Sequence, residues 1–237
     1  MKKIYSILLG TMLLGMASCE LDNYDEPGTF LTGRITYNGE AIQTRSNAVS
    51  FQLWQNGYPL KGNLDVAIDQ DGSFSGRFFD GSYKLVFAKG QGPFKTIIQN
   101  PQRLDTLDVA IKENINFDIE VLPYYMIRNA QFSHVGDDIK ATCSIEKIIT
   151  GVDAKDIEHV TLYINKTAWV SSNDQEYINN DDPEIIRGNF SDLNAINLTQ
   201  AIPEQYAGSD YLFARIAVKI KNVEDEIYSP VAKVSLK

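Results

Sequence analysis

The sequence predicts an all-β protein made of two antiparallel β-sandwich domains, and three observations support this fold class. Apolar and polar residues alternate from Phe30 almost to the end of the chain, as they do in strands with one buried face. Turn-forming pairs such as Asn38-Gly39 and Asp80-Gly81 separate the alternating runs. Pro123 closes one run just before another begins, which predicts domains at residues 30–122 and 123–237.

The strands of the first domain follow one another in short steps. A run with a period of two at 31–37 ends in the Asn38-Gly39 turn. Further runs with the same period lie at 49–53, 64–68, 74–78, 83–87, 107–111 and 115–121. A glycine-rich loop around residues 90–93 interrupts the series. Short strands at this spacing indicate an antiparallel sandwich.

The second domain begins with a predicted hairpin. Residues 126–132 and 139–145 alternate on either side of a turn at 134–138. Later strands are predicted at 160–164, 212–220 and 232–236. The segment 165–205 between them is polar and broken, and we expect at most a short helix at 191–195.

The first residues of the chain predict a lipoprotein signal peptide over residues 1–18. Lys2 and Lys3 precede an apolar stretch too short to span a bilayer, and Met16-Ala17-Ser18-Cys19 ends it with small residues before a cysteine. Cleavage before Cys19 would leave that residue as an acylated lipid anchor. The alternative is an ordinary secretory signal with an incidental cysteine, because Met16 stands where a lipobox usually has Leu.

Residues 19–29 are acidic and lack an apolar period, which predicts a tether between the lipid and the first domain. The whole chain carries a formal charge of -9. Removal of Lys2 and Lys3 with the signal leaves 20 basic against 31 acidic residues, a balance that disfavours nucleic acid and anionic lipid as partners. No other apolar run approaches the roughly 18 residues of a transmembrane helix.

Groups suited to nucleophilic or metal catalysis are scarce. Cys143 alternates with Ile139, Ala141 and Ile145 on one predicted strand face, so we expect a buried structural thiol. His134 is predicted in a turn and His159 on the exposed face of a strand, and neither has the spacing of a zinc site. No nucleophile elbow, phosphate loop or dinucleotide fingerprint occurs. We therefore expect no metal, no cofactor and no enzymatic activity.

Several motifs resemble those of an uncharacterised family of Bacteroidetes lipoproteins, known only as a domain of unknown function. They are Asp22-Asn23-Tyr24-Asp25-Glu26-Pro27, Leu31-Thr32-Gly33-Arg34-Ile35, Asp71-Gly72-Ser73-Phe74, Phe79-Asp80-Gly81-Ser82-Tyr83-Lys84 and Val121-Leu122-Pro123-Tyr124. The resemblance implies a transthyretin-like or carboxypeptidase-regulatory-like domain, then an immunoglobulin-like domain, and genes beside outer-membrane glycan importers of the SusC and SusD type. It brings no catalytic residues. The acidic tether also resembles the segment that directs such lipoproteins to the cell surface; a solvated linker is the alternative.

Two acidic features allow other chemistry. A glycosidase needs two carboxyl groups across a cleft, and the densest carboxylates are Asp181-Asp182-Pro183-Glu184 and Glu224-Asp225-Glu226, both in polar sequence where solvation explains them equally well. Asp69-Gln70-Asp71-Gly72 resembles half a calcium loop, but the downstream bidentate Glu is missing, so a hairpin turn is expected there.

Aromatic residues in polar loops are the candidate glycan-binding residues. Trp54 alternates out of phase with the core and Tyr58 follows it, while Trp169 and Tyr177 flank the polar segment 171–175. The alternative is that each packs on a sandwich edge or on the domain interface. Thr106 lies in Asp105-Thr106-Leu107, which resembles an O-glycosylation site of Bacteroides proteins.

The sequence as a whole predicts a non-catalytic lipoprotein of the outer membrane, facing the cell exterior. It would assist glycan capture or uptake by binding polysaccharide, oligosaccharide or a SusC/SusD-type transport protein. A structural protein-protein adaptor that binds no sugar is the alternative, and a glycosidase is the third hypothesis.

Overall fold

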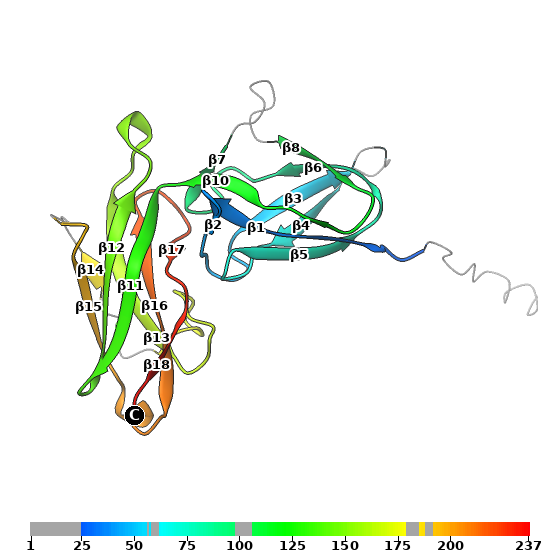
Figure 1. Ribbon diagram of the computed structural model, residues 1–237. Helices are drawn as coiled ribbons and strands as arrows, with labels where there is room; N and C mark the ends of the chain where they lie inside the picture. The colour runs from blue at the N-terminus through cyan, green and yellow to red at the C-terminus, as the bar shows by residue number, and fades with distance from the viewer. Residues whose placement is uncertain (1–24, 56, 58–61, 98–105, 179–184, 188–191) are drawn as a thin grey trace, which may run out of the picture.

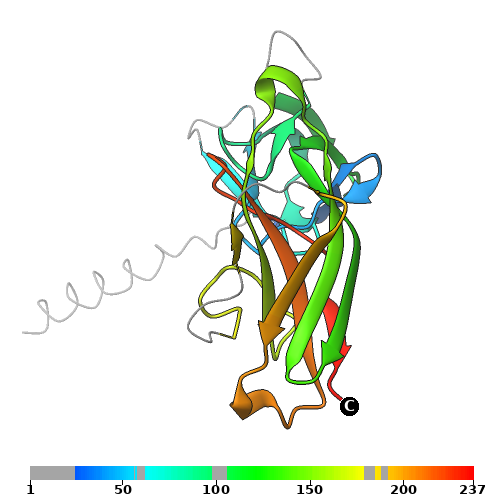
Figure 2. The ribbon, with the colours of Figure 1, turned by 90° about the vertical axis from the view of Figure 1, so that its left-hand side faces the viewer.

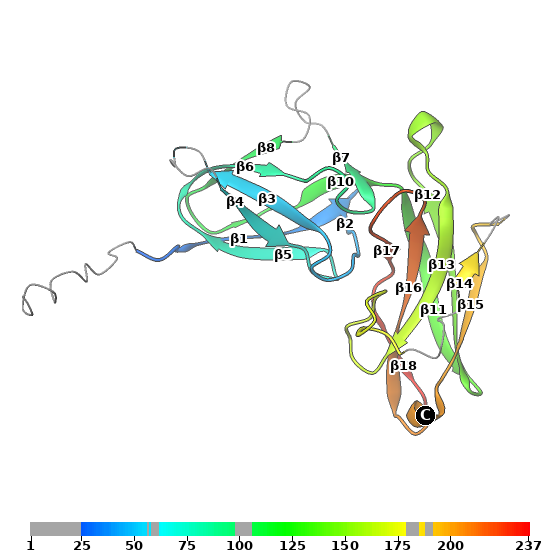
Figure 3. The ribbon, with the colours of Figure 1, turned by 180° about the vertical axis from the view of Figure 1, so that it is seen from behind.

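The chain folds into two β-domains that meet in the shape of an L (Figures 1 and 3). The computed structural model describes residues 25–55, 57, 62–97, 106–178, 185–187 and 192–237. Within these residues the regular structure consists of strands and two short 3-10 helices, η2 (Gly151–Asp153) and η3 (Glu204–Tyr206). No helix in the described part of the chain is long and apolar enough to span a membrane. The predicted all-β fold with two sandwich domains is confirmed.

The first domain contains strands β1 to β10. In chain order they are β1 (Thr29–Tyr37), β2 (Glu40–Ala41), β3 (Ser50–Gln55), β4 (Asn63–Ala67), β5 (Ser73–Phe78), β6 (Gly81–Val86), β7 (Phe94–Thr96), β8 (Thr106–Ile111), β9 (Ile115–Asn116) and β10 (Ile119–Pro123).

These strands form two sheets around an apolar core. In the first sheet β1 pairs antiparallel with β2 and β5 and parallel with β9 and β10, and β7 extends it beyond β10. The second sheet has the antiparallel order β4-β3-β6-β8. Phe51 of β3 meets Phe74 of β5 edge to face between the sheets, with 5.0 Å between ring centroids. Because, among the described residues, β5 pairs only with β1 and β4 only with β3, these two strands are at the edges of their sheets and together form one edge of the sandwich.

The second domain is also a sandwich of two sheets (Figure 2). Its strands are β11 (Tyr125–Val135), β12 (Asp138–Lys147), β13 (Ile157–Asn165), β14 (Ile185–Arg187), β15 (Ile196–Ala201), β16 (Tyr211–Ile220), β17 (Ile227–Tyr228) and β18 (Ala232–Ser235). One sheet has the order β11-β12-β15. The other has the order β14-β13-β16-β17, with β18 also paired to β16.

The predicted strand at 115–121 is in fact two strands. β9 and β10 both run parallel to β1, and the carboxylate of Asp118 between them accepts a hydrogen bond from the backbone N–H of Arg34 at 3.0 Å. The carboxylate of Asp118 thus replaces a backbone carbonyl group as hydrogen-bond acceptor, at the point where the pairing of β1 passes from β9 to β10. Alternation alone could reveal neither this break nor the parallel direction.

Other expectations also needed correction. His134 lies in β11, paired with Ile139, because the hairpin turn is shorter than predicted. In the polar segment 165–205, β15 pairs along β12, and the described residues 192–195 form a turn rather than a helix. Ile196 and Leu198 do alternate, but the run is too short to stand out in its polar surroundings. Cys143 is buried as expected, and burial raises the pKa of its thiol to about 12.

Apolar side chains of both domains form one contiguous core. Tyr125 and Met126, the first residues of the second domain, are buried in it together with Phe94 and Val121 of the first. A continuous apolar junction favours one fixed arrangement of the domains over a flexible hinge.

We predict that Gly33→Ala destabilises the first domain. A methyl group on Gly33 would overlap the backbone carbonyl oxygen of Phe117 and lie 2.7 Å from the ring of Phe74. Overpacking of this kind costs about 1–3 kcal/mol. Urea denaturation should show the loss in free energy of unfolding. Gly28→Ala is the matched control, because nothing lies within 4 Å of a methyl group there. Equal stability of the two variants would contradict the prediction.

Candidate functional site

An open groove of about 1,040 Å³ lies along the β5 edge of the first domain. This volume is slightly above the roughly 300–1,000 Å³ typical of ligand pockets. Its lining comes from β1, β4, β5, the β9–β10 region and nearby loops: Thr32, Gly33, Arg34, Ser46, Asn47, Leu64, Asp65, Val66, Ala67, Asp69, Ser73, Phe74, Ser75, Gly76, Arg77, Phe78, Asn116, Asp118 and Trp169. The groove is long and open enough for an extended ligand.

Strand register explains the polar side chains of the groove. Thr32 and Arg34 of β1 stand on the outer face of the sheet, directly opposite Ser75 and Ser73 of β5. Hydroxyl and guanidinium groups are therefore arranged in a row along the two strands. At the open edge, Leu64 of β4 is 49% exposed and adds an apolar surface.

Trp169 is the only residue of the second domain in the lining of the described groove. Its side chain is 47% exposed, so it is not a core tryptophan. It lies in the connection after β13, and the site is composed of residues from both domains. In Figure 1 this connection is the yellow-green loop that projects beneath the first domain.

Hydrogen bonds fix the backbone on both sides of Trp169. Gln70 of the first domain donates its Nε2 to the carbonyl of Ala168 at 3.0 Å. Asn165 donates its Nδ2 to the carbonyl of Trp169 itself at 2.7 Å, and Arg215 donates Nη1 to that of Val170 at 3.3 Å. Three consecutive carbonyl groups are thus held by side chains, so the indole ring is presented on a preorganised loop.

Arg215 is the fully buried residue that organises this region. Its guanidinium donates to the carbonyl groups of Ser229 at 2.8 Å and Gln70 at 2.6 Å, in addition to Val170. It also lies 4.4 Å from the centre of the Tyr228 ring. Burial lowers the pKa of Arg215 to about 10, so the side chain remains charged at neutral pH. One cation therefore joins a turn of the first domain, the Trp169 loop and the end of β17.

A second polar group lies beneath the Trp169 loop. The hydroxyl of Tyr228 donates to Glu226 at 2.6 Å and accepts from the backbone N–H of Ser172 at 3.2 Å, while Nε2 of His159 lies 3.5 Å from Glu226. Burial would raise the pKa of Glu226, but the bonds from His159, Tyr228 and Ser172 outweigh it and hold the pKa below its usual value. His159, expected at the surface, is therefore largely covered and has a structural partner.

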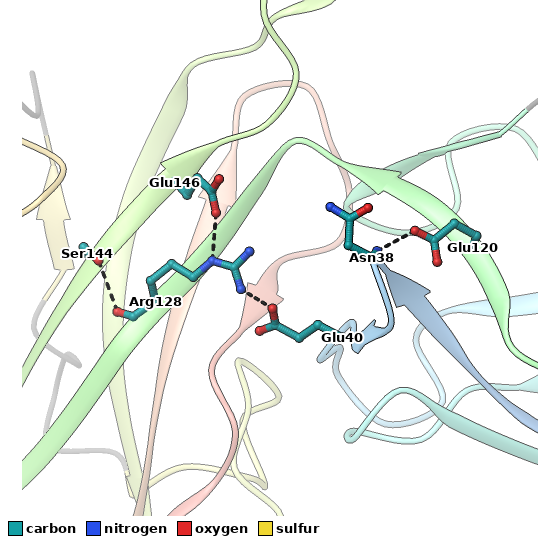
Figure 4. Close-up of polar contacts among 6 residues, drawn as sticks. All are labelled: Asn38, Glu40, Glu120, Arg128, Ser144 and Glu146. Carbon is teal, nitrogen blue, oxygen red and sulfur yellow. Dashed lines mark hydrogen bonds and ion pairs between the residues drawn. The ribbon is translucent and has the colours of Figure 1, made fainter.

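Further contacts fix the junction of the domains at its other side. Arg128 of β11 bonds Glu40 of β2 and also donates its Nε to Glu146 at 2.8 Å (Figure 4). The backbone N–H of Tyr228 donates to the carbonyl of Gln43 at 3.1 Å, and that of Gly92 donates to Asp225 at 2.9 Å. The groove thus lies between domains that are joined at several separate points.

Comparisons with known proteins agree with the two-domain architecture. The N-terminal domain of a protein of unknown function, DUF3823, matches residues 29–122, and its companion C-terminal domain of unknown function, DUF3823_C, matches residues 125–233. The chain belongs to the DUF3823 family. No curated protein matches it.

Solved structures include two similar DUF3823 proteins. One from Bacteroides ovatus is 31% identical with a TM-score of 0.75, and one from Parabacteroides merdae is 31% identical with a TM-score of 0.74. Both matches cover 89% of this chain and 100% of the other. A Bacteroides uniformis protein described as a "putative carbohydrate binding protein" has the same fold at 16% identity and a TM-score of 0.68, over 88% of this chain and 99% of its own.

The structure separates the four aromatic residues predicted from the sequence. Trp169 lines the groove, whereas Tyr177 is partly buried, with its ring 5.4 Å from that of Tyr163. Trp54 is 36% exposed on the outer face of β3 and donates its Nε1 to Gln52 at 3.1 Å, away from the groove. Tyr58 lies outside the described residues. Trp169 and Tyr177 therefore do not form a joint platform in this DUF3823 protein.

The remaining sequence candidates have these positions. Thr106 begins β8 and is partly buried, while Cys19, Asp105 and the 181–184 acidic group lie outside the described residues. The Asp69–Gly72 segment forms the expected turn, in which Gly72 has φ 81°. The described residues contain no group of three or more His, Cys, Asp or Glu side chains arranged to hold a metal.

Sequence analysis missed Arg215 and Gln70, which build the site. Arg215 alternates with the apolar residues Ala214 and Ile216 and so has the position of an ordinary outward-facing residue. A signal existed in β16, because Ala217 on the same face is apolar as well. A strand that is apolar on both faces is covered on both faces.

We predict that Arg215→Met lowers the free energy of unfolding by about 3 kcal/mol or more. The substitution leaves carbonyl groups of Gln70, Val170 and Ser229 without this donor, and an unsatisfied buried acceptor costs about 1–3 kcal/mol. Urea denaturation measures the loss. Arg77→Met is the control, since Arg77 is exposed and only joins an exposed ion pair. A similar, small effect in both variants would refute the organising role of Arg215.

Proposed function

We propose that this DUF3823 protein is a non-catalytic, lipid-anchored protein of the outer membrane, exposed on the cell surface, that binds glycan chains in the groove beside Trp169. The observation that carries the proposal is an exposed indole, held by fixed backbone, at the side of a long groove rich in hydroxyl, amide, carboxylate and guanidinium groups.

The chemistry of sugars suits this arrangement. One face of a pyranose ring carries mainly C–H groups and stacks on aromatic rings, while its hydroxyl groups exchange hydrogen bonds with side chains at the rim. In the groove, Arg34 and Asn116 supply donors, and Asp65 and Asp118 supply acceptors. A groove that follows a sheet edge can bind an internal stretch of a glycan chain, whereas a closed pocket would bind only the end of the glycan.

The structural neighbour from Bacteroides uniformis supports the same class of ligand. That protein is described as a "putative carbohydrate binding protein", and its similarity to this chain extends over both domains. At 16% identity the likeness is one of fold, so the groove residues of this chain carry the argument for sugar.

We propose binding without cleavage. In the described residues, the cysteine and the histidines lie outside the groove: Cys143 is buried in the second domain, His134 is in β11, and His159 faces Glu226. The three carboxylates of the groove each have a structural bond: Asp118 accepts from the backbone N–H of Arg34, Asp65 from Asn63, and Asp69 from the backbone N–H of Gln70.

The lipobox at residues 16–19 and the acidic tether support the surface location within this proposal. Glycan held at the surface would pass to an importer, for which the SusC/SusD-type proteins implied by the family resemblance are the proposed partners.

We predict that Trp169→Ala weakens glycan binding at least tenfold, about 1.4 kcal/mol, while the melting temperature stays nearly unchanged. Stacking and apolar burial against a sugar ring would be lost, but the ring is half exposed and contributes little to the core. A glycan array identifies a ligand for the wild type, and affinity gels then compare the variants.

Trp54→Ala is the matched control and should retain glycan affinity, because Trp54 lies outside the groove lining. Equal glycan affinity of the wild type and Trp169→Ala would contradict the assignment of the groove. A wild type that binds no glycan of any class would favour the protein-protein adaptor instead.

We predict that Cys19→Ala moves the protein from the membrane to the soluble fraction and abolishes labelling with a fatty-acid analogue. The anchor supplies the buried acyl chains, each CH₂ contributing about 0.8 kcal/mol, and the substitution removes their attachment point. Fractionation of cells that express each form measures the change. Membrane retention of an unlabelled wild type would exclude the lipoprotein.

A further inference from the structure

Three exposed aromatic side chains lie at the end of the first domain that is farthest from the second, Phe30 and Phe79 on the sheet of β1 and β5 and Trp54 on the outer face of the other sheet. Phe30 is 46% exposed, Trp54 36% and Phe79 40%. They occupy the start of β1, the end of β3 and the residue after β5. The strand directions place these three positions at the same end of the sandwich, since β5 runs against β1, β4 precedes β5 across a turn, and β3 pairs antiparallel with β4. We call this end, defined by Phe30, Trp54 and Phe79, the aromatic end.

The N-terminal segment joins the fold at the same end. Figures 1 and 3 show β1 starting on the side away from the second domain. Glu26 pairs with Arg77 at 3.5 Å, the hydroxyl of Thr29 donates to Asp80 at 2.5 Å, and the backbone N–H of Phe30 donates to Asn114 at 2.9 Å. These contacts fix the path of the chain onto the aromatic end.

The sequence bounds the distance from this end to the proposed anchor. Only six positions separate Cys19 from Asp25, the first described residue, and an extended chain spans at most about 3.3–3.6 Å per residue, or about 22 Å here. Once Cys19 is acylated, the aromatic end is therefore the part of the described fold with the shortest reach to the bilayer.

We propose that the aromatic end is a membrane-facing surface whose rings rest at the boundary between lipid headgroups and acyl chains. The proposal rests on the lipid anchor of the proposed function. Tryptophan favours this interface because its ring is both apolar and able to donate a hydrogen bond, and phenylalanine adds apolar surface on the acyl side. The lipid anchor holds the protein at the membrane, so the contact between the aromatic end and the bilayer is effectively intramolecular. A weak apolar attraction is then enough to keep this contact formed most of the time.

The charge of the molecule identifies the kind of lipid surface. Without the signal the chain has 20 basic and 31 acidic residues, and the aromatic end combines Arg77 with Glu26 and Asp80. A strongly anionic surface would repel such a protein, whereas zwitterionic headgroups would not. The contact orients the molecule: the first domain stands on the bilayer, and the second domain, with Trp169, is held on the outer side.

The two tryptophans of the chain provide the test, because Trp54 lies at the aromatic end and Trp169 lies beside the junction of the two domains. The full, acylated protein is reconstituted in phosphatidylethanolamine and phosphatidylcholine vesicles with brominated acyl chains, which quench nearby tryptophan. Trp169→Phe leaves Trp54 as the sole reporter, and Trp54→Phe leaves Trp169. We expect the emission of Trp54 to be quenched and shifted to shorter wavelength, and that of Trp169 to match its emission in unbrominated vesicles.

A double substitution Phe30→Ser with Phe79→Ser, in the Trp169→Phe background, tests whether the surface acts as a unit. Both rings are exposed, and circular dichroism verifies the fold. Quenching of Trp54 should fall while the protein still floats with the vesicles, because the lipid anchor remains.

Protein that floats with the vesicles while Trp54 and Trp169 are quenched equally, or quenching of Trp54 that is undiminished in the double variant, would overturn the membrane-facing surface and leave the anchor intact. Wild-type protein that does not float would overturn both together. The glycan affinity of the Cys19→Ala protein, measured without lipid, tests the groove independently of the anchor and of the membrane contact. Retained affinity would show that failure of either membrane experiment leaves the proposed glycan binding intact.

Discussion

The buried guanidinium of Arg215 is the constraint on which the domain arrangement depends. An arginine side chain has five N–H donors and cannot lose its charge in a protein interior, so its surroundings must supply acceptors. Here they are backbone carbonyl groups from three separate segments, at Gln70, Val170 and Ser229, with the ring of Tyr228 alongside. Because Gln70 belongs to the first domain and the other two to the second, burial of this one charge requires the domains to be docked.

The groove follows from that docking. Polar residues of β1 and β5 would line a shallow surface of the first domain alone, and Trp169 would lie on an unsupported loop of the second. The bonds from Gln70 to Ala168 and from Arg215 to Val170 bring the indole to the β5 edge and keep it there. A binding surface of this kind loses little conformational entropy when a ligand is bound, since its loop is already ordered. The backbone next to the exposed Trp169 is thus bonded directly to the fully buried Arg215, through the carbonyl group of Val170.

The two tryptophans illustrate how far local sequence patterns reach. The alternation predicts Trp54 off the core and the polar loop makes Trp169 a candidate, and both are exposed. Their surroundings nevertheless differ: Trp54 stands on an outer sheet face beside Gln52, and Trp169 faces a groove formed by residues some hundred positions away. Tyr177, close to Trp169 in the chain, turns instead toward Tyr163. Proximity in sequence therefore identified the loop but not which of its aromatic side chains faces a ligand.

The sequence by itself determined the all-β class, most of the strands, the buried Cys143 and the turn at Asp69–Gly72, because each depends on local alternation or on the backbone freedom of a glycine. The tertiary structure decided the parallel pairing of β1 with β9 and β10, the strand β15, the covered position of His159 and the role of Arg215. These features depend on partners distant in the chain. A period of two tells which face a residue occupies, but only packing tells whether that face meets water or another domain.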